Sequence, residues 1–284
     1  MTSSPRLAAW PRRVLWHALA LALLGLIMYP LVWVAGASAT PTNDIVGNTQ
    51  LLPSRPVADN FARALEGMAG IPVWRFLGNS VLLAVFTVAG TVASSALAAY
   101  AFARLRFRGR NAMFVLMIGT LLMPFHAVII PQYIIFQQLG LVDTYVPLLL
   151  GKFLATEAFF VFLMVQFMRQ LPRELDQAAR IDGCGYWGIF WHVIAPLSRP
   201  AFGTAAIFAF IWSWNDLFAP LIYLNTPEKF PIPLALRMYA DQTSTSDFGA
   251  MIAMSVIALV PVVLFFLAFQ RLLVQGMATT GLKG

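Results

Sequence analysis

The residues most able to do chemistry in this chain are three ionisable side chains set in apolar stretches. Lys152, Glu157 and Asp216 have mostly aliphatic or aromatic neighbours in the sequence. A charge at the centre of a bilayer costs about 2.5–3.5 kcal/mol on insertion scales, so such groups usually face protein or a water-filled cavity. Together with Asn215, these residues either line a path for a hydrophilic solute or form a buried polar joint. The joint is favoured for Asp216.

Helical geometry makes a further prediction about Lys152 and Glu157. The two residues are five positions apart, which is about 140° around a helix of 3.6 residues per turn. If one continuous helix carries both side chains, they point in different directions. We therefore expect no direct ion pair between them.

No catalytic or metal-binding pattern is found in the sequence. The three histidines and the single cysteine lack the spacing of a metal site: His17, His126, His192 and Cys184. The nearest string to a phosphate-binding P-loop, Gly276 to Gly281, is followed by Leu282 instead of lysine. We expect a protein that is not an enzyme and binds no cofactor itself. ATP and Mg²⁺, if they drive it, bind to a partner chain.

The segment 169–199 contains a short helix with its own start and stop signals. Pro172 suits the first turn of a helix, and Glu174 and Asp176 then lie near the positive end of its dipole. Gly183 can adopt the left-handed conformation that ends the helix. One interpretation is a knob that inserts into a groove on a partner. The alternative is a connecting loop with an interfacial helix.

The same segment resembles the EAA loop of ATP-binding-cassette (ABC) importer permeases. It contains Gln177-Ala178-Ala179, then Gly183, then Val193-Ile194-Ala195-Pro196 at the spacing of that family. Gln177 stands where the family has glutamate, so one negative charge is lost. The resemblance implies that six residues couple this chain to an ATPase: Asp176, Gln177, Ala178, Ala179, Asp182 and Gly183.

Other stretches resemble one branch of this family, the maltose-type carbohydrate-uptake permeases. They follow the family order along the chain, at residues 98–107, 123–145, 214–216 and 276–284. The resemblance implies an all-α type I permease with six transmembrane helices, which imports sugars by alternating access. Glycerol 3-phosphate or glycerophosphodiesters are the alternative substrates. A neutral sugar is preferred because the apolar stretches contain no deeply placed arginine to bind a phosphate.

The resemblance also implies partners. These are a homologous permease subunit, a cytoplasmic ABC ATPase dimer, an extracytoplasmic solute-binding protein and membrane lipid, with no nucleic acid. A secondary carrier or channel is less favoured because no inverted repeat is visible. An integral-membrane enzyme is disfavoured by the missing catalytic pattern.

The elements that must position these residues follow from composition. Of 284 residues, 60% are hydrophobic and 11% charged, and the mean hydropathy is +0.75. A soluble domain carries about 25% charged residues, and disordered chains are poor in apolar residues. The single cysteine cannot pair within the chain. These facts exclude a soluble globule, a disordered chain and a disulfide scaffold, and they favour a multi-span membrane protein.

Six stretches are apolar over the length of about 20 residues that a membrane helix needs. They are residues 15–37, 77–102, 112–134, 145–168, 201–224 and 249–269. Pro124 and Pro131 interrupt the third, where an ordinary kink is favoured over the alternative of a mobile, gating helix. For the first, a cleaved export signal ending at Ala39 is the alternative to an anchor.

The positive charges predict how the chain is oriented. Most of the 19 Lys and Arg residues lie in the N-terminus, in the loops after the second and fourth spans, and in the tail. The positive-inside rule then places both termini in the cytoplasm of a bacterial inner membrane. The prediction is a cytoplasmic N-terminus over 1–14 and a single membrane domain over 15–284.

Overall fold

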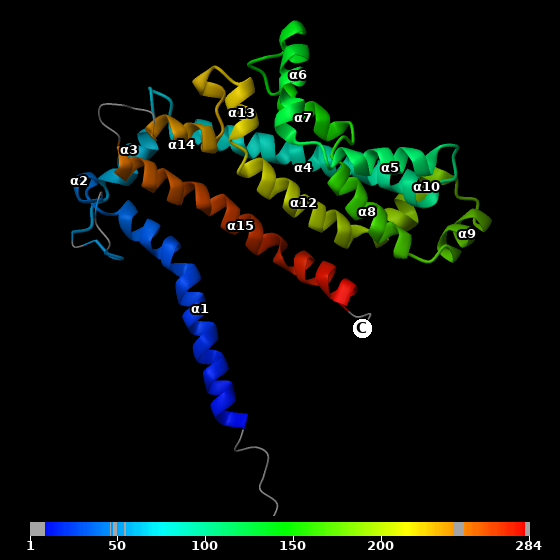
Figure 1. Ribbon diagram of the computed structural model, residues 1–284, viewed down its shortest axis with the longest axis horizontal. Coiled ribbons are helices and arrows are strands. Elements are labelled where there is room, and N and C mark those ends of the chain that lie inside the picture. Colours follow the sequence, from blue (N-terminus) through cyan, green and yellow to red (C-terminus); the bar gives the residue numbers. More distant parts are fainter. Residues whose placement is uncertain (1–8, 46, 48–49, 54, 241–246, 282–284) are drawn as a thin grey trace, which may run out of the picture. The chain divides into compact units, whose positions relative to one another are not determined.

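The computed structural model describes residues 9–281 except 46, 48–49, 54 and 241–246. The described residues form helices and no β-strand (Figure 1), as the sequence predicts. Contacts divide the chain into two compact units, one of residues 1–73 and 238–259, the other of residues 74–237 and 260–284. The predicted Lys283-Gly284 tail lies outside the described residues.

The first unit is built from helices that border polar loops. It contains α1 (Ala9–Ser38), α2 (Thr42–Ile45), α3 (Asp59–Glu66) and the first part of α15 (Phe248–Gly281). Residues 13–32 of α1 are all exposed, as expected of an apolar helix that is covered by lipid or by another chain.

Arg63 of α3 holds the loops of the first unit together. Its guanidinium donates to Asp247 Oδ2 at 2.6 Å, to Thr42 Oγ1 at 2.9 Å and to Asn60 Oδ1 at 2.8 Å. Asn60 is almost fully buried, and its amide donates to backbone carbonyls at the end of α1 and just after it, at 2.9 and 2.7 Å. The carboxylate of Asp247 also accepts the amide of Ala250 at 3.0 Å, in the first turn of α15.

The second unit contains most of the helices. They are α4 (Val73–Arg104), α5 (Arg110–Thr120), α6 (Phe125–Gln138), α7 (Val146–Phe153), α8 (Ala158–Gln170), α9 (Glu174–Ile181), α10 (Tyr186–Ile189), α11 (Ala195–Leu197), α12 (Arg199–Trp214), α13 (Phe218–Tyr223), most of α14 (Ile232–Ala240) and the rest of α15. A π-helical turn, Phe190–Ile194, joins α10 to α11.

The core of this unit lies between α4, α8 and the helical run that follows α9. Ala96, Ala99 and Ala103 of α4 are buried beside Met164 and Met168 of α8 in one cluster. Small side chains on a membrane helix let neighbouring backbones approach closely. This cluster brings the end of α4 against the segment 169–199, which the sequence predicts to be functional.

Four helical stretches in the described residues are long and apolar enough to cross a membrane. They are Arg13–Ser38, Val73–Arg104, Val146–Gln170 and Phe248–Gln270, which match the predicted spans 15–37, 77–102, 145–168 and 249–269. Two bent helix pairs bring the number to six if each is one span.

The third predicted span, 112–134, is bent far more than the sequence suggests. Helices α5 and α6 meet at 99°, whereas kinks count as sharp above about 20°. Pro124 is extended, with φ −67° and ψ 129°, and lies directly before α6. The residue before a proline avoids the helical region, so the chain leaves one helix and starts another. The prediction of a simple kink is wrong. The fifth predicted span, 201–224, is likewise two helices, α12 and α13.

Candidate functional site

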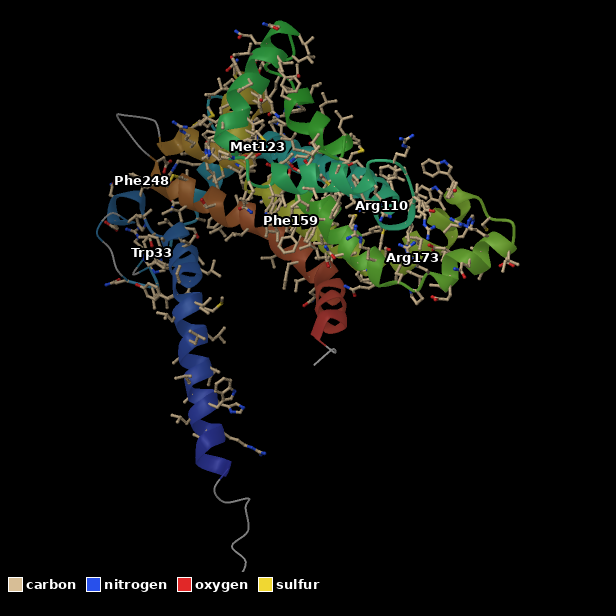
Figure 2. The ribbon with its side chains drawn as sticks, turned by 45° about the vertical axis from the view of Figure 1, so that its right-hand side comes forward. Trp33, Arg110, Met123, Phe159, Arg173 and Phe248 are labelled. Carbon is tan, nitrogen blue, oxygen red and sulfur yellow. The ribbon has the colours of Figure 1, made fainter. Side chains whose placement is uncertain are left out.

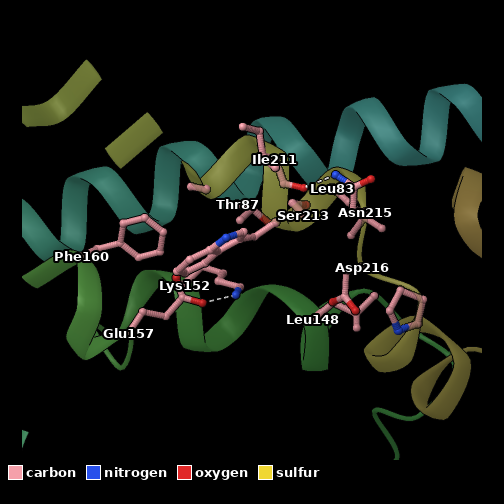
Figure 3. Close-up of a pocket in the computed structure, with 13 residues that line it drawn as sticks. Leu83, Thr87, Leu148, Lys152, Glu157, Phe160, Ile211, Ser213, Asn215 and Asp216 are labelled. Carbon is pink, nitrogen blue, oxygen red and sulfur yellow. Dashed lines mark hydrogen bonds and ion pairs between the residues drawn. The ribbon is translucent and has the colours of Figure 1, made fainter. Parts of the chain in front are cut away.

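Four of the predicted site residues come together at one cavity of the second unit. Lys152, Glu157, Asn215 and Asp216 line a cavity of about 350 Å³ (Figure 3), although the sequence places them in two different apolar stretches. The cavity lies between α4, the α7–α8 segment and the α12–α13 segment. Tertiary packing therefore joins groups that the sequence predicts only one by one.

Lys152 and Glu157 form a direct ion pair, so the prediction that they do not pair is wrong. The reason is a break in the helix between them. Helix α7 ends at Phe153, Ala155 has a positive φ of 54°, and α8 begins at Ala158. Helical spacing does not apply across this break, and the chain folds back far enough for the two side chains to meet.

Side chains of α4 hold the break in place. Thr91 Oγ1 donates to Glu157 Oε2 at 3.2 Å, and Ser94 Oγ donates to the Lys152 carbonyl at 2.7 Å. Thr87, one turn earlier, accepts a hydrogen bond from Ser213 Oγ at 3.3 Å. Hydroxyl groups on one face of α4 thus contact both other walls of the cavity.

Asp216 has a structural contact and also borders the cavity. It lies in the break after α12, and its Oδ1 accepts the amide of Ala219 at 3.2 Å, in the first turn of α13. Asn215 is exposed and donates to the carbonyl of Ile211 at 2.8 Å. Both interpretations of Asp216, a polar joint and a cavity lining, are compatible with this placement.

An aromatic side chain completes the wall. Trp212 of α12 lines the cavity with about half of its surface exposed, and its ring lies 5.0 Å from that of Phe160 and 5.1 Å from that of Phe159. Sequence reasoning passed over Trp212 because an isolated tryptophan in an apolar stretch has no distinguishing pattern. The cavity lining therefore offers hydroxyls, carboxylates and aromatic side chains, while its one lysine is already paired.

The predicted coupling helix is present as α9 and ends as the sequence suggests. Gly183 has a left-handed φ of +85°, its amide donates to the Arg180 carbonyl at 3.0 Å, and the Cys184 amide donates to the Ala179 carbonyl at 2.9 Å. Gln177, Ala178, Asp182 and Gly183 are exposed. Ala179 is buried in the core.

Asp176 faces the chain instead of the exposed side of α9. Its carboxylate pairs with Arg104 at the end of α4, at 3.3 Å, and the Arg104 side chain is only 2% exposed. Arg104 also donates to the carbonyl of Leu171, just before α9, at 2.9 Å. Charge pairing with α4 thus fixes the helix. The sequence did not predict this role of Arg104, because its partner Asp176 lies 72 positions away.

The helical run after α9, made of α10 and the π-helical turn Phe190–Ile194, also contacts α4. Tyr100 donates to the Tyr186 carbonyl at 2.9 Å, and its ring lies 5.2 Å from that of Phe190. Phe190 and Ile194 are buried, while Trp191 is exposed. The helical run after α9 is therefore packed against the end of α4 through Tyr100 and Phe190.

Asp143, in the loop before α7, is the centre of a polar cluster that the sequence did not predict. Its carboxylate accepts four hydrogen bonds from the loop that follows α13: the amides of Asn225 and Thr226 at 2.9 and 3.0 Å, the Thr226 hydroxyl at 2.5 Å and Lys229 Nζ at 2.7 Å. The hydrogen bonds from Lys229 and Thr226 hold the pKa of Asp143 well below its usual range. No local motif marks such a residue, because its partners lie more than 80 positions away.

The start of α4 binds the same loop. Asn79 donates to the carbonyls of Glu228 and Phe230 at 2.8 and 3.0 Å, and Arg75 donates to the Glu228 carbonyl at 3.1 Å. Two loops and the start of one helix are therefore joined into one polar platform around Asp143.

Comparisons with known proteins agree with this architecture. Residues 90–279 match the family described as binding-protein-dependent transport system inner membrane component. The arabinooligosaccharides transport system permease protein AraQ of Halalkalibacterium halodurans is 34% identical, over 90% of this chain and 91% of that protein. The trehalose transport system permease protein SugB of Mycobacterium tuberculosis is 30% identical, over 96% and 98%. The galactooligosaccharides transport system permease protein GanQ of Bacillus subtilis is 29% identical, over 96% of each chain.

A solved structure shares the fold. It is a chain of a bacterial ABC transporter involved in the import of the acidic polysaccharide alginate, with a TM-score of 0.79 and 24% identity, over 95% of this chain and 99% of that one. The predicted all-α permease fold is confirmed, and so is the resemblance to ABC importer permeases. The chain belongs to the family of binding-protein-dependent transport system inner membrane components, and it is a multi-pass, non-catalytic permease subunit that works with a binding protein and an ATPase.

Proposed function

We propose that this permease imports neutral carbohydrates, in the size range from disaccharides to oligosaccharides. The observation that carries the proposal is the agreement among relatives, which are named for arabinooligosaccharides, galactooligosaccharides and trehalose. The cavity supports it, since hydroxyls, carboxylates and an exposed tryptophan suit the hydroxyl groups and apolar faces of sugar rings.

The charges of the cavity favour a neutral substrate over a phosphorylated one. Lys152 is paired with Glu157, and Asp216 adds a further carboxylate to the lining. A phosphate group is favoured by an available cation, preferably a bidentate arginine, and the lining contains no unpaired cation. Glycerol phosphates would meet a net negative wall and be repelled.

The proposed orientation places α9 in the cytoplasm and the Asp143 platform outside. The platform would receive the solute-binding protein, because polar cross-links give it a fixed shape. Six spans form half of a translocation path, so a homologous permease subunit would supply the other half. ATP and Mg²⁺ would bind to a cytoplasmic ATPase dimer, and this chain would hold no cofactor.

Helix α9 would transmit the motion of the ATPase. Gln177, Ala178, Asp182 and Gly183 form its exposed side and would contact the ATPase, while Asp176 and Ala179 would position the helix from within. The neutral Gln177 would contact its partner by hydrogen bonds alone. Coupling requires contacts that differ between two states, and a helix fixed to α4 through Arg104 can carry such contacts into the membrane.

An uptake panel tests the substrate. Cells that depend on this importer are given labelled trehalose, arabinooligosaccharides, galactooligosaccharides and glycerol 3-phosphate, and the uptake of each is measured. We expect uptake of at least one neutral sugar and none of glycerol 3-phosphate. Uptake of glycerol 3-phosphate alone would overturn the substrate proposal. Uptake in liposomes that contain this chain without ATPase would overturn the proposed mechanism.

A further inference from the structure

An open basic cavity lies where α4 ends and α5 begins, apart from the sites described above. Its volume is about 500 Å³, and it is lined by Arg106, Phe107, Gly109, Arg110, Asn111, Ala112 and Arg173. Three of these seven residues are arginines and none is acidic. Arg110 and Arg173 lie at the same end of the second unit in Figure 2.

Within the part of the chain that the structure describes, Arg110 and Arg173 donate only to neutral groups, and Arg106 makes no hydrogen bond. Arg110 donates to the Leu105 carbonyl at 3.1 Å and to its neighbour Asn111 at 3.5 Å. Arg173 donates to the Ala103 carbonyl at 3.4 Å. Arg104 nearby differs, since it is paired with Asp176. Three guanidinium groups thus share one cavity without an anion to offset their repulsion.

The backbone adds to the positive potential of the cavity. Gly109 precedes α5 with a left-handed φ of 80°, and no side chain caps the helix. The first turn of α5 contains no acidic residue, and two of its residues, Asn111 and Ala112, line the cavity. The free N–H groups at a helix start favour an anion, and bidentate arginines favour a phosphate in particular.

The surroundings of the cavity indicate which phosphate it binds. Helix α5 belongs to one of the bent pairs that are apolar enough for the membrane. Beyond the cavity it exposes Met113, Val115 and Leu116 at 53%, 67% and 71%, and Phe107 in the cavity wall is 40% exposed. A ligand with a phosphate group and acyl chains satisfies both the arginines and this apolar face. Free phosphate satisfies only the arginines.

We propose that this cavity binds the phosphate headgroup of an anionic phospholipid, with its acyl chains along α5. Basic pockets at the ends of membrane helices are suited to such headgroups, and each arginine near the membrane surface adds about fivefold to the affinity for anionic lipid. Arg173, which lines the cavity, directly precedes α9, so the bound lipid contacts the same segment that carries the predicted coupling helix.

Native mass spectrometry of the full-length permease, purified in non-ionic detergent with its partner subunits, tests this proposal. The protein is titrated with phosphatidylglycerol and, separately, with phosphatidylcholine. We expect preferential binding of phosphatidylglycerol, and a loss of about fivefold in its affinity for each of Arg106→Gln, Arg110→Gln and Arg173→Gln. Arg108→Gln is the matched control, because Arg108 lies in the same loop and carries the same charge but does not line the cavity.

Two further arms identify the source of the phosphate and control for folding. Inorganic phosphate at about 10 mM should leave phosphatidylglycerol bound, since it makes no contact with the apolar face of α5. Displacement by phosphate, equal binding of phosphatidylcholine, or an equal loss in Arg108→Gln would each overturn the proposal. Arg106 is exposed and makes no hydrogen bond within the described residues, so Arg106→Gln should fold normally. If Arg110→Gln or Arg173→Gln fails to fold, the affinity of Arg106→Gln for phosphatidylglycerol decides the outcome.

Discussion

The end of helix α9 gives the sharpest test of the coupling proposal. Gly183 and Gly185 lie two positions apart, and an added Cβ would meet no atom within 4 Å at either one. Only the backbone differs, because Gly183 has φ +85° while Gly185 has φ −76° and ψ 177°. The same methyl group therefore strains one position and leaves the other relaxed.

The size of the effect follows from this geometry. The left-handed conformation costs a non-glycine residue about 1–2 kcal/mol, whereas alanine adopts the extended conformation of Gly185 freely. Gly183→Ala should therefore open the last turn of α9 about 5–30-fold more often. Gly183→Asn should fall between wild type and Gly183→Ala, since asparagine tolerates the left-handed region better than other residues.

Two measurements check this reasoning. Hydrogen exchange of the Gly183 and Cys184 amides, which donate to Arg180 and Ala179, should accelerate by that factor in Gly183→Ala. The ATPase activity that the loaded binding protein stimulates in proteoliposomes should fall in the same order of variants. Unchanged exchange, or equal effects of Gly183→Ala and Gly185→Ala, would refute the role of the left-handed turn. Accelerated exchange with normal coupling would refute α9 as the docking element.

Three further predictions concern stability in detergent, measured by thermal unfolding. Lys152→Met and Glu157→Gln should each destabilise the protein and show a coupling energy of about 1–2 kcal/mol in a double-mutant cycle, because the two side chains pair directly. Asp143→Asn should cost about 1–3 kcal/mol at pH 7, since an amide cannot accept all four hydrogen bonds. Gly249→Ala should cost about 1–3 kcal/mol, because its added Cβ would overlap Asn60 Oδ1.

The controls for these predictions follow from the same structural features. The folded-state pKa of Asp143 is lowered, so its stabilisation is complete above the unfolded pKa of about 3.9 and is lost as the pH falls further. The difference between wild type and Asp143→Asn should therefore shrink below about pH 4, and a constant difference would contradict the charge argument. Gly78→Ala is the control for Gly249→Ala, because Gly78 has open space around it. Additive effects at Lys152 and Glu157 would argue against their pairing.

Helix boundaries were predictable wherever a local signal sets them. The left-handed turn at Gly183 and the apolar runs of α1, α4 and α15 match their predictions because backbone conformation and hydrophobic length are properties of short segments. The bend before Pro124 was only partly predictable. Proline marks the place where a helix is interrupted, while the 99° angle depends on what each helix packs against.

The sequence by itself determined that this chain is a helical membrane protein, where its charges lie along the chain and which segment resembles a coupling loop. Composition and short-range spacing contain that information, because the bilayer constrains every span in the same way. Only the tertiary structure decided which polar groups meet. The Lys152–Glu157 pair depends on a helix break at Ala155, and the Arg104–Asp176 pair joins residues 72 positions apart. Such contacts depend on the packing of α4 against its neighbours. No local pattern in the sequence predicts that packing.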